Sequence, residues 1–158
     1  MKIIYFIILF LLFHGKALAT EIANDNRVYN WKVIRVVDGD SLEIANEFLP
    51  EELKLFVRIK GIDTPEKAPR AKCEKENILA QKASNYTKNS IEKAQKNHQK
   101  ITFSEIKWDK YGGRIVAKVM IDKNELGQEL VRRGLARIYN GEKKKTWCNN
   151  TPTLKSGE

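Results

Sequence analysis

The sequence is poor in histidine and cysteine, and this shortage limits the catalytic centres that it can build. It contains two residues of each type, and only His98 and the two cysteines lie beyond the N-terminal leader described below. His98 stands in a run of polar residues, where we expect a surface position. One histidine and two distant cysteines cannot supply the four ligands of an ordinary zinc site. Mechanisms that use a histidine nucleophile or paired histidines are disfavoured for the same reason, and the sequence has no internal repeat and no P-loop.

Long hydrophobic runs are also scarce, and the longest one lies at the N-terminus. Lys2 gives a positive start, residues 3–13 are all apolar, and Ala17-Leu18-Ala19 fits an A-x-A cleavage signal. The run is shorter than the roughly 20 residues that a transmembrane helix needs. Residues 1–19 are therefore predicted to be a signal peptide, and no nearby cysteine suggests a lipoprotein. We expect an exported protein, periplasmic or secreted, without stable membrane association after cleavage.

The charge of the chain is strongly of one sign. Cleavage removes Lys2 and Lys16, so the net charge falls from +9 to +7, and 139 of the 158 residues remain. That length suits one domain with a real core. A basic surface suits a polyanionic partner, because neutralising phosphates releases counterions; the alternative is a solvated face, as in residues 95–100. The predicted organisation is a loose lead-in at residues 20–28, one domain at residues 29–148 and a polar tail at residues 149–158.

The two cysteines stand far apart in the mature chain. Cys73 precedes a predicted long helix, and Cys148 follows Trp147 near the C-terminus. Export places both in a compartment that permits disulfides. The chain-entropy model credits such a long loop with about 4–4.5 kcal/mol as an upper figure. Because the sequence does not fix the distance between the Cα atoms, two free buried thiols are the alternative.

Alternation of polar and apolar residues predicts several short strands. They cover residues 29–37, 41–44, 53–62, 101–108 and 115–121, and a last extended piece covers residues 135–139. In the third strand Leu55, Val57 and Ile59 share one face. In the fourth strand the alternation slips at Ile106 and Trp108, which a bulge would explain.

Helical spacing predicts one long and one short helix. The long helix covers residues 73–97, where apolar or small residues recur at spacings of three and four, namely Leu79, Ala83, Tyr86, Ser90 and Ala94. The short helix covers residues 126–133, and Gly134 takes the C′ position. Five strands with a helix between the third and fourth predict an α+β fold dominated by a five-stranded oligonucleotide-binding (OB) β-barrel with one long and one short helix. A split α+β sheet is the alternative.

Two acidic segments follow strands and are candidate metal ligands. Asp40 and Asp63 each come just past a strand, so both can reach one mouth of a barrel. Ca²⁺ takes carboxylate and backbone carbonyl oxygens, and the Thr64 carbonyl can complete the set. Asp40 can instead belong to an ordinary turn. Thr64 can instead cap a helix, although Pro69 cannot continue a regular helix.

Three further side chains suit phosphodiester hydrolysis. Glu66 is the candidate base, since a carboxylate can orient a water and accept its proton. Arg58 and Arg114 are candidate phosphate clamps, because a guanidinium makes bidentate contacts to phosphate oxygens and stays charged. The alternatives are an outward-facing residue of an amphipathic strand for Arg58 and a simple hairpin position for Arg114.

The order and spacing of these motifs resemble the staphylococcal nuclease (thermonuclease) family. The resemblance runs from about Trp31 to Tyr139. It is carried by the Asp-Gly-Asp turn at residues 38–40, by Arg58 five residues before Asp63-Thr64-Pro65-Glu66, by Asp109-Lys110-Tyr111-Gly112-Gly113-Arg114, and by Leu130-Val131-Arg132-Arg133-Gly134-Leu135-Ala136. Two features depart from the family pattern. The basic turn has two glycines before its arginine, and the chain ends where a long third helix would follow.

The resemblance implies a specific activity and a role for each matched residue. It implies an OB-type barrel that cleaves DNA and RNA with Ca²⁺, prefers single strands and leaves 3′-phosphate ends. Asp40, Asp63 and the Thr64 carbonyl would hold the calcium ion. Arg58 and Arg114 would hold the phosphate, and Glu66 would act as the base.

The leading interpretation is therefore an exported, monomeric, calcium-dependent nuclease. A non-catalytic exported nucleic-acid-binding barrel is the first alternative, and an exported interaction or envelope protein is the second. A pure binding protein would be expected to lose one of the four residues Asp40, Asp63, Arg58 and Glu66, and all four are present.

Overall fold

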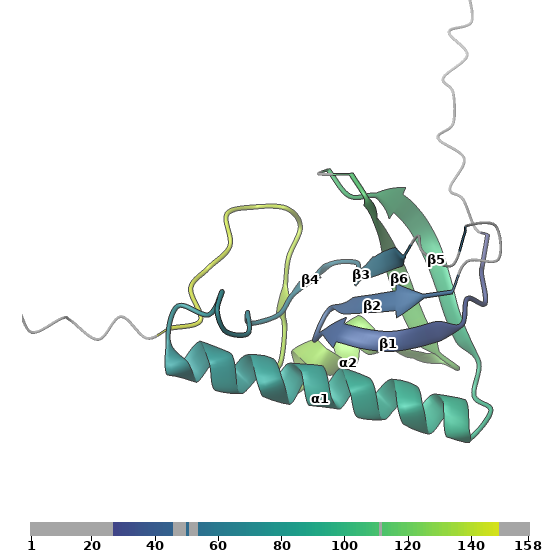
Figure 1. The fold of residues 1–158 in the computed structure, drawn as a ribbon, viewed down its shortest axis with the longest axis horizontal. Coiled ribbons are helices and arrows are strands. Elements are labelled where there is room, and N and C mark those ends of the chain that lie inside the picture. Colours follow the sequence, from purple (N-terminus) through teal and green to yellow (C-terminus); the bar gives the residue numbers. More distant parts are fainter. Residues whose placement is uncertain (1–26, 46–49, 51–53, 111, 149–158) are drawn as a thin grey trace, which may run out of the picture.

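A mixed β-sheet with a long helix along one side forms the body of the computed structural model (Figure 1). The structure describes residues 27–45, 50, 54–110 and 112–148. The predicted signal peptide, most of the lead-in and the polar tail lie outside these residues. The described elements are β1 (Val33–Asp38), β2 (Ser41–Ile44), β3 (Leu55–Ile59), β4 (Ile62–Asp63), α1 (Glu74–Lys96), β5 (Ile101–Trp108), β6 (Arg114–Ile121), β7 (Asn124–Glu125), α2 (Leu126–Arg132) and β8 (Arg137–Ile138).

The main sheet has the order β1-β2-β3-β6-β5, and β7 pairs with β6. The β3–β6 pair is parallel and the other neighbours are antiparallel, while β4 and β8 form a separate antiparallel pair. One isolated bridge, between Tyr29 and Phe103, joins the chain before β1 to β5. Within the described residues these pairings do not close the sheet. The predicted α+β class is confirmed, but the closed five-stranded barrel is not.

The first strand is shorter than predicted because regular pairing with β2 begins only at Val33. The third strand is shorter than predicted, because a turn at residues 60–61 separates β3 from β4, and of its predicted apolar face Val57 and Ile59 are fully buried while Leu55 is partly buried. The predicted bulge in β5 is confirmed, since the register shifts between Ser104 and Lys107. Alternation within the sequence was therefore a sound guide to which side chains enter the core.

Helix α1 packs on the sheet through small side chains. The prediction that Ala83 and Ala94 are buried is confirmed. The rest of the predicted stripe is wrong by one position, since Leu79, Tyr86 and Ser90 are only partly buried, whereas Ala80, Thr87 and Ile91 are buried. A line of small residues lets the helix approach the β1–β2 turn closely, and this close approach decided the rotation of the helix.

The C-terminal segment returns to the start of α1, where the predicted disulfide is present. Cys73 and Cys148 have an S–S distance of 2.09 Å and Cα atoms 6.0 Å apart. Figure 1 shows the segment that follows β8 as a loop beside the chain between β4 and α1. Neither helix in the described part of the chain is both long enough and apolar enough to cross a membrane.

Candidate active site

The tight turn between β1 and β2 places Asp40 inside the protein. The residue is only 4% exposed, and the Ser41 hydroxyl donates a hydrogen bond of 3.0 Å to its Oδ1. The turn lies directly on α1: a Cβ atom on Gly39 would lie 2.8 Å from the Cβ of Ala83. Burial raises the pKa of Asp40 above its ordinary value, and the nearby Arg58 guanidinium lowers it only in part. The site therefore holds a carboxylate whose charge is poorly solvated.

Arg58 joins the two acidic segments. Its Nη2 lies 2.8 Å from Oδ2 of Asp40 and 3.4 Å from Oδ1 of Asp63. Asp63 ends β4 and is 5% exposed, and Thr64 beside it is 4% exposed. Antiparallel pairing of β2 with β3 sets Arg58 opposite Ser41, next to the first acidic turn. Two carboxylates predicted from separate motifs thus share one guanidinium.

Glu66 stands at the more open side of this cluster. The chain from residue 64 to residue 67 has no helical structure, so the helix-start alternative for Thr64 is wrong. Oε2 of Glu66 lies 3.0 Å from Nε of Arg70, and its Oε1 lies 3.2 Å from Nζ of Lys144. The side chain is 34% exposed, whereas Asp63 is buried. A water and a substrate can reach this carboxylate from solvent.

Arg114 lies on the same face of the sheet as Arg58. In the parallel pairing Arg114 is opposite Phe56, two positions from Arg58, so the side chains point to the same side. Asp109 accepts a hydrogen bond of 2.9 Å from Nε of Arg114 and holds the guanidinium in place. Gly112 and Gly113 both have positive φ, and the extra glycine leaves Arg114 in the pocket.

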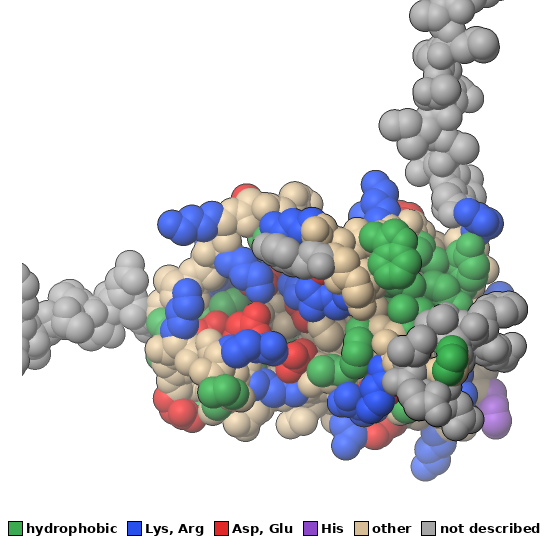
Figure 2. Space-filling model, turned by 45° about the horizontal axis from the view of Figure 1, so that its top comes forward, with side chains coloured by type: hydrophobic (Ala, Val, Ile, Leu, Met, Phe, Trp, Pro, Cys, Tyr) green, Lys and Arg blue, Asp and Glu red, His purple; other side chains and the backbone are tan. Residues whose placement is uncertain are grey.

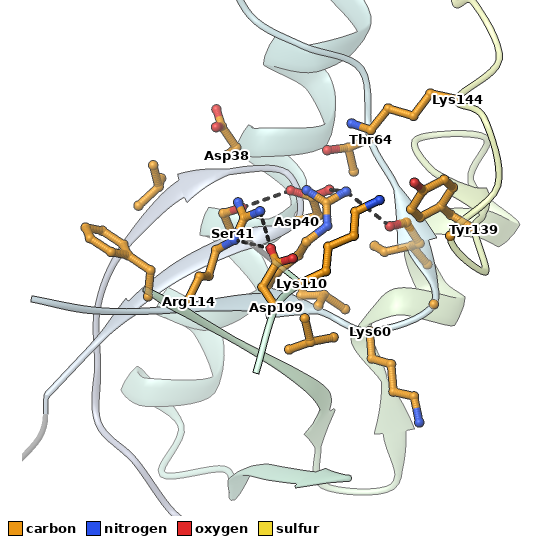
Figure 3. Close-up of a pocket in the computed structure, with 18 of the residues that line it drawn as sticks. Asp38, Asp40, Ser41, Lys60, Thr64, Asp109, Lys110, Arg114, Tyr139 and Lys144 are labelled. Carbon is orange, nitrogen blue, oxygen red and sulfur yellow. Dashed lines mark hydrogen bonds and ion pairs between the residues drawn. The ribbon is translucent and has the colours of Figure 1, made fainter. Parts of the chain in front are cut away.

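A pocket of about 850 Å³ lies beside this cluster. Of the predicted site residues, Asp40, Arg58, Thr64, Glu66 and Arg114 line it, whereas Asp63 does not and is paired with the lining residue Arg58. Figure 3 shows Asp109 and Arg114 facing each other across from Thr64 and Lys144. Figure 2 shows lysine and arginine side chains around a hollow that contains acidic side chains, with hydrophobic side chains beside it. The pocket combines buried carboxylate oxygens, which could bind a metal ion, with a rim of lysine and arginine side chains.

Sequence reasoning missed Lys144 and Trp147, which reach the site from the C-terminal loop. Nζ of Lys144 lies 2.7 Å from Oδ1 of Asp63, and the Trp147 indole donates a hydrogen bond of 3.4 Å to Oδ2 of the same carboxylate. Burial lowers the pKa of Lys144, but the hydrogen bond and charge of Asp63 raise it more, so that it lies above its ordinary value. The predicted disulfide was the one sequence signal that pointed to these two residues, because it brings residue 148 back toward the loop that follows Asp63.

The donor atoms of this pocket suit a hard divalent cation. Asp40 and Asp63 offer carboxylate oxygens with little access to water, and Ca²⁺ selects such oxygens. The raised pKa of Asp40 indicates that a nearby positive charge would relieve the cost of its burial. A second cluster, formed by Cys73, Glu76 and Cys148, also brings metal-ligand residue types together. Its sulfur atoms are bonded to each other and provide no thiolate.

Comparison with known proteins indicates the same family as the sequence motifs. The family model of staphylococcal nuclease homologues matches residues 56–155, which include Arg58, Asp63, Glu66 and Arg114. A thermonuclease of Staphylococcus hyicus is 31% identical over 113 residues, covering 68% of this chain and 57% of that protein. A probable endonuclease of Schizosaccharomyces pombe is 29% identical over 122 residues, covering 73% of this chain and 47% of that protein. The chain thus spans about half the length of these relatives, and it belongs to the staphylococcal nuclease homologue family.

Proposed function

We propose that this protein is an exported, calcium-dependent nuclease that hydrolyses phosphodiester bonds in DNA and RNA. The observation that carries the proposal is that Arg58 joins the buried carboxylates of Asp40 and Asp63, and that Asp40, Arg58 and Glu66 line one solvent-open pocket. The family membership and the relatives named as nucleases support it. The proposal includes a preference for single strands and products with 3′-phosphate ends.

Asp40, Asp63 and the Thr64 carbonyl would hold the calcium ion. When bound, the ion supplies positive charge that offsets the charge of the phosphate and of the transition state. The protein contributes the burial that makes these oxygens strong ligands. Arg58, already positioned between the two carboxylates, stays charged throughout and can turn its remaining N–H donors toward a phosphate oxygen.

Glu66 is the proposed general base. Its carboxylate faces the pocket and is partly solvated, so it can accept a proton from a water that attacks phosphorus. Arg58 and Arg114 project from neighbouring strands and would bind the equatorial oxygens as charge accumulates there. Because Asp109 fixes Arg114 before substrate binds, little reorganisation is needed during the reaction.

The rim of the pocket supports the preference for single strands. Trp108 is 70% exposed at the end of β5 and lines the pocket, together with Phe56, Lys107 and Lys110. Exposed aromatic rings stack on unpaired bases, while lysines attract the backbone. Bases stacked within a duplex do not offer their faces in this way.

The N-terminal leader and the disulfide support export. We also propose that the protein acts as a monomer and that the sheet belongs to the OB barrel type. The strand order with one parallel pair and the bridge between Tyr29 and Phe103 support the barrel, because this bridge joins the chain just before the edge strand β1 to the other edge strand, β5.

The test is incubation of pure mature protein with denatured DNA, duplex DNA and RNA, in calcium or in a chelator. We expect cutting in calcium, fastest on denatured DNA and RNA, and no cutting in chelator. Enzymatic labelling of the products should find phosphate at the 3′ ends. Equal cutting in chelator would contradict the calcium assignment, and tight binding without cutting would favour the non-catalytic alternative.

A further inference from the structure

The C-terminal loop brings a lysine to two carboxylates that the proposed mechanism needs. Nζ of Lys144 lies 2.7 Å from Oδ1 of Asp63 and 3.2 Å from Oε1 of Glu66. The first is a proposed metal ligand and the second is the proposed base. The side chain of Lys144 is 43% exposed, so one side of the ammonium group faces the pocket.

The loop that carries Lys144 is held by the disulfide, by the Trp147 indole and by Arg137. The disulfide fixes Cys148 beside α1, and the Trp147 indole is bonded to Asp63 and is 8% exposed. The Arg137 guanidinium lies 3.7 Å from the centre of the Trp147 ring, and its Nη1 donates a hydrogen bond of 2.9 Å to the Thr146 carbonyl oxygen. The backbone near Lys144 is therefore anchored, while its four-carbon side chain can still change direction.

We propose that Lys144 is a substrate-binding residue that occupies the cation site until a divalent cation arrives. In the unliganded protein its ammonium neutralises Asp63 and Glu66. When Asp63 holds a divalent cation, the Lys144 ammonium would leave this carboxylate, turn into the pocket and contact a phosphate of the nucleic acid. The same movement releases Oε1 of Glu66 to accept a proton, while Oε2 stays paired with Arg70. This inference rests on the proposed function and adds a residue that none of the sequence motifs contains.

The charge of Lys144 should have opposite effects on the affinity for calcium and on the affinity for nucleic acid. An ammonium that competes with calcium weakens calcium binding, because both would use the Asp63 carboxylate. An ammonium that contacts phosphate strengthens substrate binding. Removing the charge should therefore change the two affinities in opposite directions. A lysine that only holds the loop in place would lower both affinities when removed.

The experiment compares Lys144→Met with the parent, with Lys144→Arg and with the control Lys145→Met. Lys145 is the next residue, is exposed, and carries the same charge, so the control matches the change in net charge. Titration calorimetry with Ca²⁺ alone should show about fivefold tighter binding in Lys144→Met and no change in Lys145→Met. At saturating calcium, KM for single-stranded DNA should rise severalfold in Lys144→Met, while Lys144→Arg stays near the parent. Circular dichroism checks that each variant is folded.

The outcomes distinguish a failure of this inference from a failure of the proposed function. If the parent binds calcium and cuts DNA, but Lys144→Met binds calcium no more tightly, the displacement is wrong and the proposed function stands. A KM for Lys144→Met equal to that of the parent would overturn the phosphate contact. A parent that binds no calcium would overturn this inference together with the calcium assignment.

Discussion

The buried hydroxyl of Thr87 donates a hydrogen bond of 2.7 Å to the backbone carbonyl oxygen of Gly39. This contact ties the middle of α1 to the turn that carries Asp40, and it joins two residues 48 positions apart in the sequence. Ala83, one helical turn earlier, leaves just enough room for Gly39. The helix thus supports the turn that holds the poorly solvated Asp40 carboxylate in the wall of the pocket.

Gly39→Ala should therefore displace the acidic turn. The added Cβ would lie 2.8 Å from the Cβ of Ala83 and 3.1 Å from Cγ2 of Thr64, so the turn must move. We expect a loss of about 1–3 kcal/mol in the free energy of unfolding, typical of overpacking. Calcium affinity should fall as well. Urea unfolding and calcium titration measure the two effects.

The matched control for Gly39→Ala is its combination with Ala83→Gly. Ala83→Gly alone should cost about 1 kcal/mol through helix propensity. The double variant should regain part of the calcium affinity, because the obstructing methyl group is gone. Purely additive losses in calcium affinity would contradict a steric origin.

Arg58→Lys tests bidentate geometry against simple charge. Lysine keeps the charge but loses the planar fork, so we expect kcat to fall on the order of 100–1000-fold while affinity for nucleic acid changes far less. Single-turnover cleavage beside binding of an uncut oligonucleotide measures the two quantities. A folded Arg58→Lys variant that cuts near the parent rate would show that the clamp is not needed.

Arg58 also contributes to the stability of the fold, which its position in the sequence did not indicate. The alternation of β3 places Arg58 on the polar face of its strand, and an outward-facing position is the alternative to a phosphate clamp. The side chain is instead 16% exposed and pairs with two buried carboxylates. Arg58→Ala should therefore destabilise the protein by about 3–5 kcal/mol, because it removes the guanidinium from the buried Asp40 carboxylate, while Asp63 keeps its contact with Lys144. Comparison of urea unfolding for Arg58→Ala and Arg58→Lys tests this point.

Local pattern predicted much of the fold and part of the site, for a physical reason. Period-two alternation and the turn residues placed Arg58, Asp63 and Glu66 near strand ends, because those signals act within a few residues. The contacts of Trp147 and Lys144 with Asp63 could not be predicted in this way. These contacts join residues far apart in the sequence, with a separation of 84 between Asp63 and Trp147. They form only because the C-terminal segment folds back beside the loop that follows β4.

Helix rotation and barrel closure depended on similar long-range packing. The spacing of Leu79, Tyr86 and Ser90 favoured one face of α1, but the fit between Ala83 and Gly39 selected the neighbouring face. Closure of the sheet depends on how many residues before Val33 can pair with β5. Only Tyr29 does so among the described residues, and no local signal sets that number.

Glu66→Gln should remove the proposed base with little change in shape. The amide cannot accept the proton from water, so we expect kcat to fall by at least about 100-fold. Its side chain is partly exposed, and the free energy of unfolding should change little. Single-turnover cleavage and circular dichroism provide the readouts. Equal rates for Glu66→Gln and the parent would assign the base to another group.

Trp108→Ala should weaken binding of single strands more than binding of duplexes. Stacking of one base on an aromatic ring contributes about 1–3 kcal/mol, and Trp108 is 70% exposed at the pocket rim. Ile34→Ala is the control, since Ile34 is an exposed apolar residue of β1 that does not line the pocket. Fluorescence anisotropy with single-stranded and duplex oligonucleotides gives the comparison. Equal losses on both substrates would argue against stacking.

The disulfide should matter for activity as well as for stability. Denatured, non-reduced protein should contain no thiol that alkylates, and alkylation of two thiols per chain would contradict the bridge. Replacing both cysteines by serine releases a closure over 75 residues, with a predicted loss of up to about 4–4.5 kcal/mol in the free energy of unfolding. Because Cys148 anchors the loop that carries Lys144 and Trp147, the folded fraction of this variant should also cut DNA more slowly. Single-turnover rates at low temperature, corrected for the folded fraction by circular dichroism, separate the two effects. If the corrected rate equals that of the parent, the bridge stabilises the fold without positioning the loop.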